Sequence, residues 1–223
     1  MSSNISTIIW DWNGTLLNDM DICVDAINQL LAKRGLPLMT LEKYRRLFTF
    51  PVISYYERIG FDFSREPYDQ VAIEFITIYF DRLRHASLFE GVRPVLDFFS
   101  RKGMRQAILS AMEQENLNRS VFSMDIGHYF SHISGSSDHY ANGKTGQASA
   151  ILKLLGSKPS ESLIIGDTLH DYEVARETSC HCLLVSAGHQ ERERLLSSGQ
   201  TVVKSLEDLP SLFNGVEPPY FLQ

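Results

Sequence analysis

Three polar residues, Asp11, Ser110 and Asp167, come at the ends of short apolar runs that are typical of buried strands. Open parallel sheets bind their ligands beyond the carboxyl ends of the strands. The three side chains are therefore expected to meet in one crevice, although they are far apart in the sequence. A carboxylate there can act as a nucleophile, and carboxylate oxygens suit a divalent cation. The pattern indicates nucleophilic or metal-assisted chemistry in a single site.

The elements that position these residues alternate between strand and helix from Gly91 onward. Short apolar runs, separated by stretches with helical periodicity, lie at 7–10, 106–109, 132–134, 162–165, 182–185 and 201–203. Such alternation is typical of a parallel sheet with helices on both faces. We therefore expect an α/β fold, built as a Rossmann-like, doubly wound parallel sheet.

The segment between the first strand and Gly91 differs, because it shows helical patterns and no clear strand. Apolar residues recur at helical spacing from Ile22 to Leu31. Further helices are expected at about 40–50, 52–59 and 66–85. We therefore predict a Rossmann-like catalytic core of residues 1–16 and 91–223, with residues 17–90 inserted as an all-α cap domain.

Four motifs resemble those of the haloacid dehalogenase superfamily, in the same order and each in its expected context. The run Asp11-Trp12-Asn13-Gly14-Thr15 is similar to the first motif, D-x-D-G-T. Ser110 at a strand end resembles the second motif, and Lys144 before a helix, in Asn142-Gly143-Lys144, resembles the third. The run from Gly166 to Asp171 resembles the fourth, G-D-x-x-x-D. The helical insert resembles the cap of the phosphoglycolate phosphatase and β-phosphoglucomutase branch.

The resemblance implies a magnesium-dependent phosphatase that hydrolyses a small phosphomonoester, such as phosphoglycolate, through an aspartyl-phosphate intermediate. The catalytic residues that it implies are Asp11 as the nucleophile, Asn13, Ser110 and Lys144. The residues implied for substrate binding are Thr15, Ser110, Ala111 and Lys144. The implied Mg²⁺ ligands are Asp11, the backbone carbonyl of Asn13, Asp167 and Asp171. Mg²⁺ would offset the charge of the phosphate and orient it.

Asn13 departs from the family pattern. In the phosphatase branch this position is an Asp that protonates the leaving oxygen and later activates water, and an amide does neither. A catalytically weak phosphate-ligand-binding protein is therefore the alternative function. Three other readings fit less well. A phosphonate hydrolase needs a lysine that the stretch Leu47–Val52 lacks, a dehalogenase needs no metal pair such as Asp167 with Asp171, and a phosphomutase usually keeps the acid/base Asp.

Short connections at both ends of the insert predict a mobile lid that closes over the site. Arg45 or Arg46 is a candidate for contact with an anionic substrate, although a solvated helix face explains either one equally well. The aromatic residues Tyr55 and Tyr56 are expected in the core of the insert and not in a substrate site.

Composition excludes several classes of partner. The chain has 223 residues and a formal charge of −6, without a run of Lys or Arg, so nucleic acid is not expected as a partner. No apolar stretch is long enough to cross a membrane, and no signal peptide is recognised. Three cysteines, an odd number, favour a reducing cytoplasm over a disulfide framework. We expect a cytoplasmic monomer or homodimer whose partner is a small phosphorylated metabolite.

Overall fold

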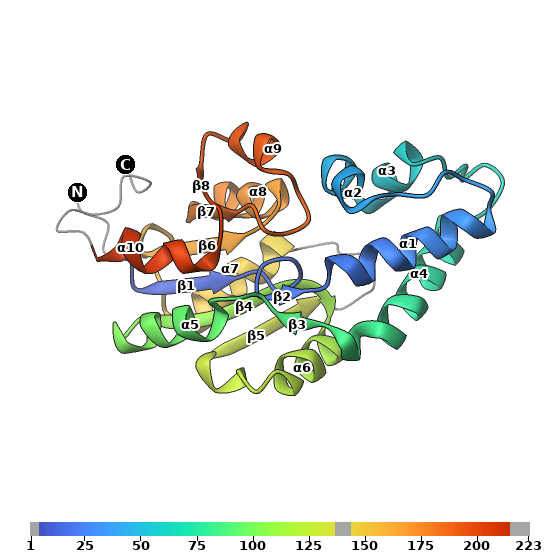
Figure 1. Cartoon of the computed structure of the whole chain (residues 1–223). Coiled ribbons are helices and arrows are strands. Elements are labelled where there is room, and N and C mark those ends of the chain that lie inside the picture. The colour runs from blue at the N-terminus through green and yellow to red at the C-terminus, as the bar shows by residue number, and fades with distance from the viewer. Residues whose placement is uncertain (1–4, 137–143, 215–223) are drawn as a thin grey trace.

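The computed structural model describes residues 5–136 and 144–214 (Figure 1). Its centre is a six-stranded sheet in the order β5-β4-β1-β6-β7-β8, in which every neighbouring pair is parallel. The strands are β1 (Thr7–Trp10), β4 (Arg105–Glu113), β5 (His132–Ser136), β6 (Ser162–Gly166), β7 (His181–Val185) and β8 (Thr201–Val203). The predicted α/β, Rossmann-like doubly wound sheet is confirmed.

The central strand β1 alternates its side chains between the two faces of the sheet. Ile8 and Trp10 pack into one apolar cluster and Ile9 into another, and all three are fully buried. The first cluster includes the helices α5 (Val92–Arg101), α6 (Gln114–Ser123) and α10 (Leu209–Phe213), and it extends into residues 17–90. Those of the second are α7 (Lys144–Leu155), α8 (Leu169–Thr178) and α9 (Arg192–Leu196). Burial on both faces explains why the β1 sequence is a continuous apolar run.

The helical insert (residues 17–90) lies beyond the carboxyl end of β1 (Figure 1). Its helices are α1 (Met20–Lys33), α2 (Leu41–Leu47), α3 (Val52–Arg58) and α4 (Tyr68–Arg82), and α1 packs against α4. The expectation that this segment contains no strand was wrong at its two ends. There β2 (Leu17–Asn18) pairs antiparallel with β3 (Ser87–Leu88). Two-residue strands are too short to carry a periodic pattern, so the sequence could not reveal them.

The third motif lies at a helix start, because Lys144 is the first residue of α7. Asn142 and Gly143, which precede it in the motif, lie outside the described residues. Four short 3₁₀ helices complete the described part of the chain, at Leu83–His85, Gly127–Tyr129, Pro159–Glu161 and Leu206–Asp208. None of the helices in these described ranges has the length and apolar character that crossing a membrane requires.

Candidate active site

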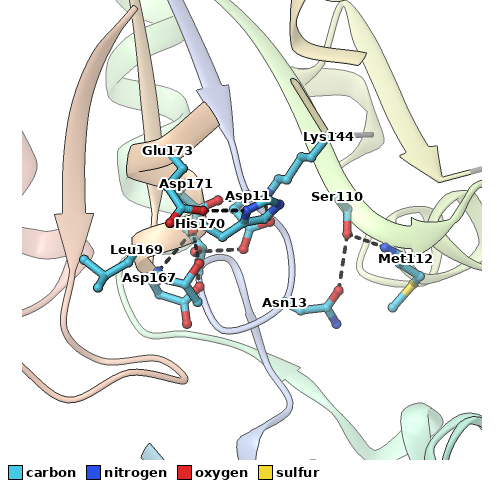
Figure 2. Close-up of polar contacts among 12 residues, drawn as sticks. Asp11, Asn13, Ser110, Met112, Lys144, Asp167, Leu169, His170, Asp171 and Glu173 are labelled. Atoms are coloured by element: carbon cyan, nitrogen blue, oxygen red, sulfur yellow. Dashed lines mark hydrogen bonds and ion pairs between the residues drawn. The ribbon is translucent and has the colours of Figure 1, made fainter. Parts of the chain in front are cut away.

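Asp11, Ser110 and Asp167 meet at the carboxyl edge of three adjacent strands, β1, β4 and β6 (Figure 2). Asp11 follows β1 and Asp167 follows β6, as expected. Ser110 lies inside β4, because that strand continues to Glu113 across a register shift. The expectation that the strand ends at Ser110 was therefore wrong. The irregular register still turns the hydroxyl into the site, where it donates to Asn13 Oδ1 at 3.3 Å.

Lys144 bridges two carboxylates. Its Nζ atom lies 2.6 Å from Asp11 Oδ1 and 2.6 Å from Asp171 Oδ1, and all three side chains are buried. Burial disfavours the ammonium, but the two carboxylates outweigh it and raise the pKa of Lys144. Burial likewise opposes ionisation of Asp171, yet Lys144 holds the pKa of Asp171 below its ordinary value. For Asp11 burial prevails over Lys144 and raises its pKa to about 8.

Asp11, Asp167 and Asp171 form a buried cluster in which one oxygen from each carboxylate lies within 4.8 Å of the others. Burial raises the pKa of Asp167 as well. Three carboxylates beside the single ammonium of Lys144 leave an excess of negative charge in a place where unpaired charge is costly. Hard carboxylate oxygens with a negative excess are the donor set that a hard divalent cation takes. The residues therefore fit such a cation, which would offset their mutual repulsion.

Glycines allow the carboxylates to lie so close to the main chain. A Cβ atom at Gly166 would lie 2.1 Å from Asp171 Cγ, and one at Gly188 would lie 2.2 Å from Asp167 Oδ2. At Gly14, where φ is +74°, a Cβ atom would lie 2.4 Å from Asp167 Oδ2. Contacts this short do not occur, so any side chain at these three positions would displace a carboxylate.

Thr15 and Asp171 bind other residues of the site. The Thr15 hydroxyl donates to Asp167 Oδ1 at 3.1 Å. Asp171 Oδ2 accepts hydrogen bonds from the Thr168 amide at 3.0 Å and the Thr168 hydroxyl at 2.8 Å, and the bond from the amide belongs to a capping box at the start of α8. Both residues hold the cluster in place, and the predicted contact of Thr15 with substrate stays a prediction.

A hydrogen-bond network that the sequence did not reveal holds the side chain of Asn13. Its Nδ2 atom donates to Asp19 Oδ2 at 2.9 Å and to the Tyr79 hydroxyl at 2.8 Å. The Tyr79 hydroxyl in turn donates to Asp19 Oδ2 at 2.7 Å. His189 Nε2 lies 3.4 Å from Asp19 Oδ1, and its Nδ1 atom lies 2.9 Å from the Tyr44 hydroxyl. The network joins the first motif to the insert and to the segment after β7.

Asp19 and His189 form a buried ion pair in this network. Burial disfavours the charged imidazole, but Asp19 raises the pKa of His189 to about 9. Burial also disfavours the charged carboxylate, but His189, Tyr79 and Asn13 keep the pKa of Asp19 below its ordinary value. In the sequence, Asp19 is indistinguishable from an ordinary N-cap residue before α1, and nothing connects it with a histidine 170 positions away.

A cavity of about 210 Å³ lies between this edge of the sheet and the insert. The predicted site residues that line it are Asp11, Asn13, Ser110, Ala111, Lys144 and Asp167. Thr15 and Asp171 lie behind this lining. Tyr55 and Tyr56 belong to the apolar core, as expected, but they also line the cavity, so the expectation that they lie away from the substrate site was wrong. Neither Arg45 nor Arg46 is among the lining residues, so neither contacts a substrate in this closed arrangement.

Arg45 binds the main chain of the core instead. Its guanidinium donates to the carbonyl oxygens of Ser186 and Gln190. In the other direction, Gln190 Nε2 and Arg194 Nη1 donate to the Phe48 carbonyl at 3.1 and 2.5 Å. We call these contacts the latch, because they fasten the end of α2 to the segment that follows β7. The structure does not support the idea that Arg45 recognises the substrate, since its Nη2 atom donates to backbone carbonyls away from the cavity.

The family of haloacid dehalogenase-like hydrolases has a sequence model that matches residues 8–185. The chain belongs to this family. The match includes all four motifs, from Asp11 to Asp171, so the predicted recognition and the assignment as a hydrolase are confirmed.

Two curated relatives to which this chain is similar are both named phosphoglycolate phosphatase. The chain is 23% identical over 218 residues to a phosphoglycolate phosphatase of Pseudomonas syringae pv. syringae, covering 93% of this chain and 78% of that protein. It is 26% identical over 215 residues to one of Caulobacter vibrioides, covering 93% and 90%.

Solved structures share the fold. A predicted phosphoglycolate phosphatase from Haemophilus somnus has a TM-score of 0.78 at 16% identity, covering 94% of this chain and 98% of that one. A haloacid dehalogenase-like protein of unknown function from Agrobacterium tumefaciens has a TM-score of 0.79 at 21% identity, with coverage of 94% and 98%.

Proposed function

We propose that the protein is a magnesium-dependent phosphatase that hydrolyses a small phosphorylated metabolite through a phosphorylated Asp11. One observation carries the proposal: Asp11 lines the cavity in contact with Lys144, with Asp167 and Asp171 beside it. Phosphoryl transfer through a carboxylate requires a nucleophile, a cation that binds phosphate oxygens, and oxygen ligands for a metal. The relatives named phosphoglycolate phosphatase support the same reaction class.

Each residue of the site then has its own task. Asp11 attacks the phosphorus and carries the phosphoryl group, which divides hydrolysis into two easier steps. The Lys144 ammonium and the Ser110 hydroxyl, with the backbone N–H of Ala111, hold the phosphate oxygens. The residues that would hold Mg²⁺ are Asp11, the backbone carbonyl of Asn13, Asp167 and Asp171. When bound, Mg²⁺ offsets the charge that the phosphate adds to the site.

We also propose that residues 17–90 act as a cap domain over a core of residues 1–16 and 91–223. The cavity between the two parts and the latch that holds them together support this division. A cap of this kind excludes water during transfer and opens for exchange of substrate and product. Opening is tested by hydrogen exchange at Phe48 and Thr49, which should slow when phosphate and Mg²⁺ are added together.

A phosphate-binding protein with little turnover is the second candidate, and Asn13 is the observation that favours it. Its amide donates to Asp19 and Tyr79 and carries no acidic proton that could reach a leaving oxygen. This candidate predicts phosphate binding in the presence of Mg²⁺ without release of phosphate from any monoester.

Release of inorganic phosphate from a panel of small monoesters, with and without Mg²⁺, tests the proposal. Asp11→Asn replaces the nucleophile by a near-isostere and should abolish release while the protein stays folded. Asp81→Asn changes an exposed carboxylate on α4 and is the matched control, which should keep wild-type activity. Release that survives Asp11→Asn would reject the covalent mechanism. Binding without release in the wild type would favour the second candidate.

A further inference from the structure

Apart from Asp19 and the hydroxyls of its tyrosines, the wall that the insert contributes to the cavity is apolar and largely aromatic. It includes Phe48, Phe50, Val52, Ala72, Phe75 and Ile76. The opposite wall carries the charged residues of the first, third and fourth motifs. A phosphate held at Asp11 would therefore direct its leaving group toward the apolar wall. The chemistry of that wall decides which leaving group the site accepts.

The described residues of the insert offer no cation to this cavity, because none of their Lys or Arg side chains lines it. Several are engaged in ion pairs elsewhere: Arg34 with Glu66 and Glu74, and Arg82 with Asp25. Arg45 belongs to the latch. A carboxylate on the leaving group, such as that of phosphoglycolate, would face the aromatic wall without a partner.

Among the described residues, the two cations that line the cavity are already paired. Lys144 contacts Asp11 and Asp171, and His189 contacts Asp19 and the Tyr44 hydroxyl. Lys144 is also needed for the phosphate. Neither one is free to neutralise a second anionic group on the substrate.

Two further tyrosine hydroxyls in the wall have partners. The Tyr79 hydroxyl is held by Asn13 and Asp19, and the Tyr55 hydroxyl donates to Met39 Sδ at 3.4 Å. The Tyr79 hydroxyl already donates its proton to Asp19 at 2.7 Å, so it is not available to a leaving oxygen. The amide of Asn13 cannot supply that proton either. Among the described residues, neither Asn13 nor Tyr79 is free to protonate a poor leaving group, so the site suits one that departs without protonation.

We propose that the substrates are monoesters of phosphate with an uncharged aromatic alcohol, that is, aryl phosphates with a single ring. The inference rests on the proposed phosphatase function. An apolar cavity of about 150 Å³ is enough to hold benzene, so the cavity of about 210 Å³, which must also take the phosphoryl group, has room for no more than a single ring. The ring packs against Phe75 and its neighbours, and edge or offset contacts with aromatic side chains favour it over an aliphatic group.

The reaction is balanced with water as the only co-reactant. Asp11 forms a bond to phosphorus while the bond between phosphorus and the aryl oxygen breaks, and the electron pair leaves with the aryl oxygen. The phenoxide takes its proton from solvent. Water then attacks the phosphorus of the aspartyl phosphate, which releases inorganic phosphate and restores the carboxylate of Asp11.

Initial rates with Mg²⁺ on four compounds test the proposal: phenyl phosphate, 4-carboxyphenyl phosphate, phosphoglycolate and acetyl phosphate. The two aryl compounds share the leaving-group type and differ in charge at the far end of the ring. We expect kcat/KM for phenyl phosphate to exceed kcat/KM for 4-carboxyphenyl phosphate and for phosphoglycolate at least about 100-fold. The carboxylate of each of these two compounds would have no partner in the cavity. Acetyl phosphate needs neither ring nor proton, and it reports phosphatase activity independently of the wall.

Two arginine substitutions on α4 give a second measurement. Ile76 lines the cavity, whereas Ile73 on the same helix is 59% exposed. Ile76→Arg should reduce the preference for phenyl over 4-carboxyphenyl phosphate at least about tenfold, since it supplies the missing cation. Ile73→Arg should leave the preference unchanged.

The possible outcomes separate the two proposals. A preference for phenyl phosphate that falls in Ile76→Arg but not in Ile73→Arg supports the aryl class. If Ile76→Arg does not fold, the substrate panel on the wild type decides by itself. If 4-carboxyphenyl phosphate or phosphoglycolate is hydrolysed as fast as phenyl phosphate or faster, the aryl class is overturned and the phosphatase function is retained. If the protein hydrolyses none of the four compounds, acetyl phosphate included, the phosphatase function is overturned, and the aryl class with it.

Discussion

Substituting Asn13 by Asp restores the residue type of the family motif, and the contacts of Asn13 predict how the activity responds. Asn13 Nδ2 now donates to Asp19 Oδ2 at 2.9 Å and to the Tyr79 hydroxyl at 2.8 Å. In Asn13→Asp an oxygen takes the place of this donor, directly beside a carboxylate. The new carboxyl can keep the contact with Asp19 only if it carries a proton.

The electrostatic cost of ionising the new carboxyl is large. Two unit charges 2.9 Å apart repel by about 6 kcal/mol at an effective dielectric constant of about 20. His189 neutralises part of the charge on Asp19, so the net cost is smaller but still raises the pKa of the new carboxyl. A carboxyl that stays protonated near neutral pH is the form that a general acid needs.

The effect on rate differs between classes of substrate. A positioned general acid is worth roughly 10²- to 10⁴-fold when the leaving group needs a proton. Asn13→Asp should therefore raise kcat/KM on an alkyl phosphate by about 10²-fold or more, and on phenyl phosphate by less than about tenfold. kcat/KM is the right quantity, because it reports the first step, in which the leaving group departs.

The second step provides an independent signal. Water attacks the phosphorylated Asp11 without help from a base at position 13, whichever substrate delivered the phosphoryl group. On phenyl phosphate the wild type should therefore release a rapid burst of phenol, close to one per enzyme molecule, before a slow steady state. Stopped-flow absorbance measures the burst, which should shrink in Asn13→Asp because a base speeds the second step.

Asn214→Asp is the matched control, since it makes the same chemical change at an exposed position after α10. It should change neither kcat/KM nor the burst. An Asn13→Asp protein that folds and yet hydrolyses the alkyl phosphate no faster than the wild type would refute the reasoning. Another group would then already supply the proton.

The same contacts lead to three further predictions. Lys144→Met leaves two buried carboxylates without their cation, so thermal denaturation should show a loss of about 3–5 kcal/mol, partly recovered by Mg²⁺. His189 has a pKa raised to about 9, so its ion pair contributes up to about 3 kcal/mol below about pH 6.5. That contribution is lost as the pH rises through 9, and His189→Gln should flatten this part of the stability profile. Asn13 should resist deamidation, checked by peptide mass, because the attacking Gly14 amide donates to Asp19 at 3.1 Å.

The sequence predicted the polar cluster because its members follow local rules. Asp11 and Asp167 come at the ends of apolar runs, and β1 lies between β4 and β6 in the sheet. Parallel neighbours end at the same edge, so residues at strand ends must meet once the sheet is known. Lys144 was found through its motif, and its distance to Asp11 follows from the start of α7 beside this edge.

Contacts between distant segments were not predictable in the same way. Asp19 and His189 carry no shared pattern, since one caps a helix and the other lies in an irregular segment. Arg45 was a candidate for substrate contact or for a solvated helix face, but it binds a carbonyl oxygen of the segment after β7, which only the folded chain brings near. The apolar periodicity of α4 does not distinguish core residues from Ile76, which lines the cavity. Both kinds of residue are withdrawn from solvent.

The hydrogen bonds of the latch are accepted mainly by main-chain carbonyl oxygens. Gln190 and Arg194 both reach the Phe48 carbonyl, and the Glu191 amide donates to the Arg45 carbonyl at 3.3 Å. A carbonyl oxygen is present whatever residue occupies the position, so these bonds do not constrain the side chain of Phe48. Closure of the insert and the composition of its inner wall are therefore separable traits. In the course of evolution, or in a library of variants, the wall can be exchanged residue by residue while the closing contacts are inherited unchanged.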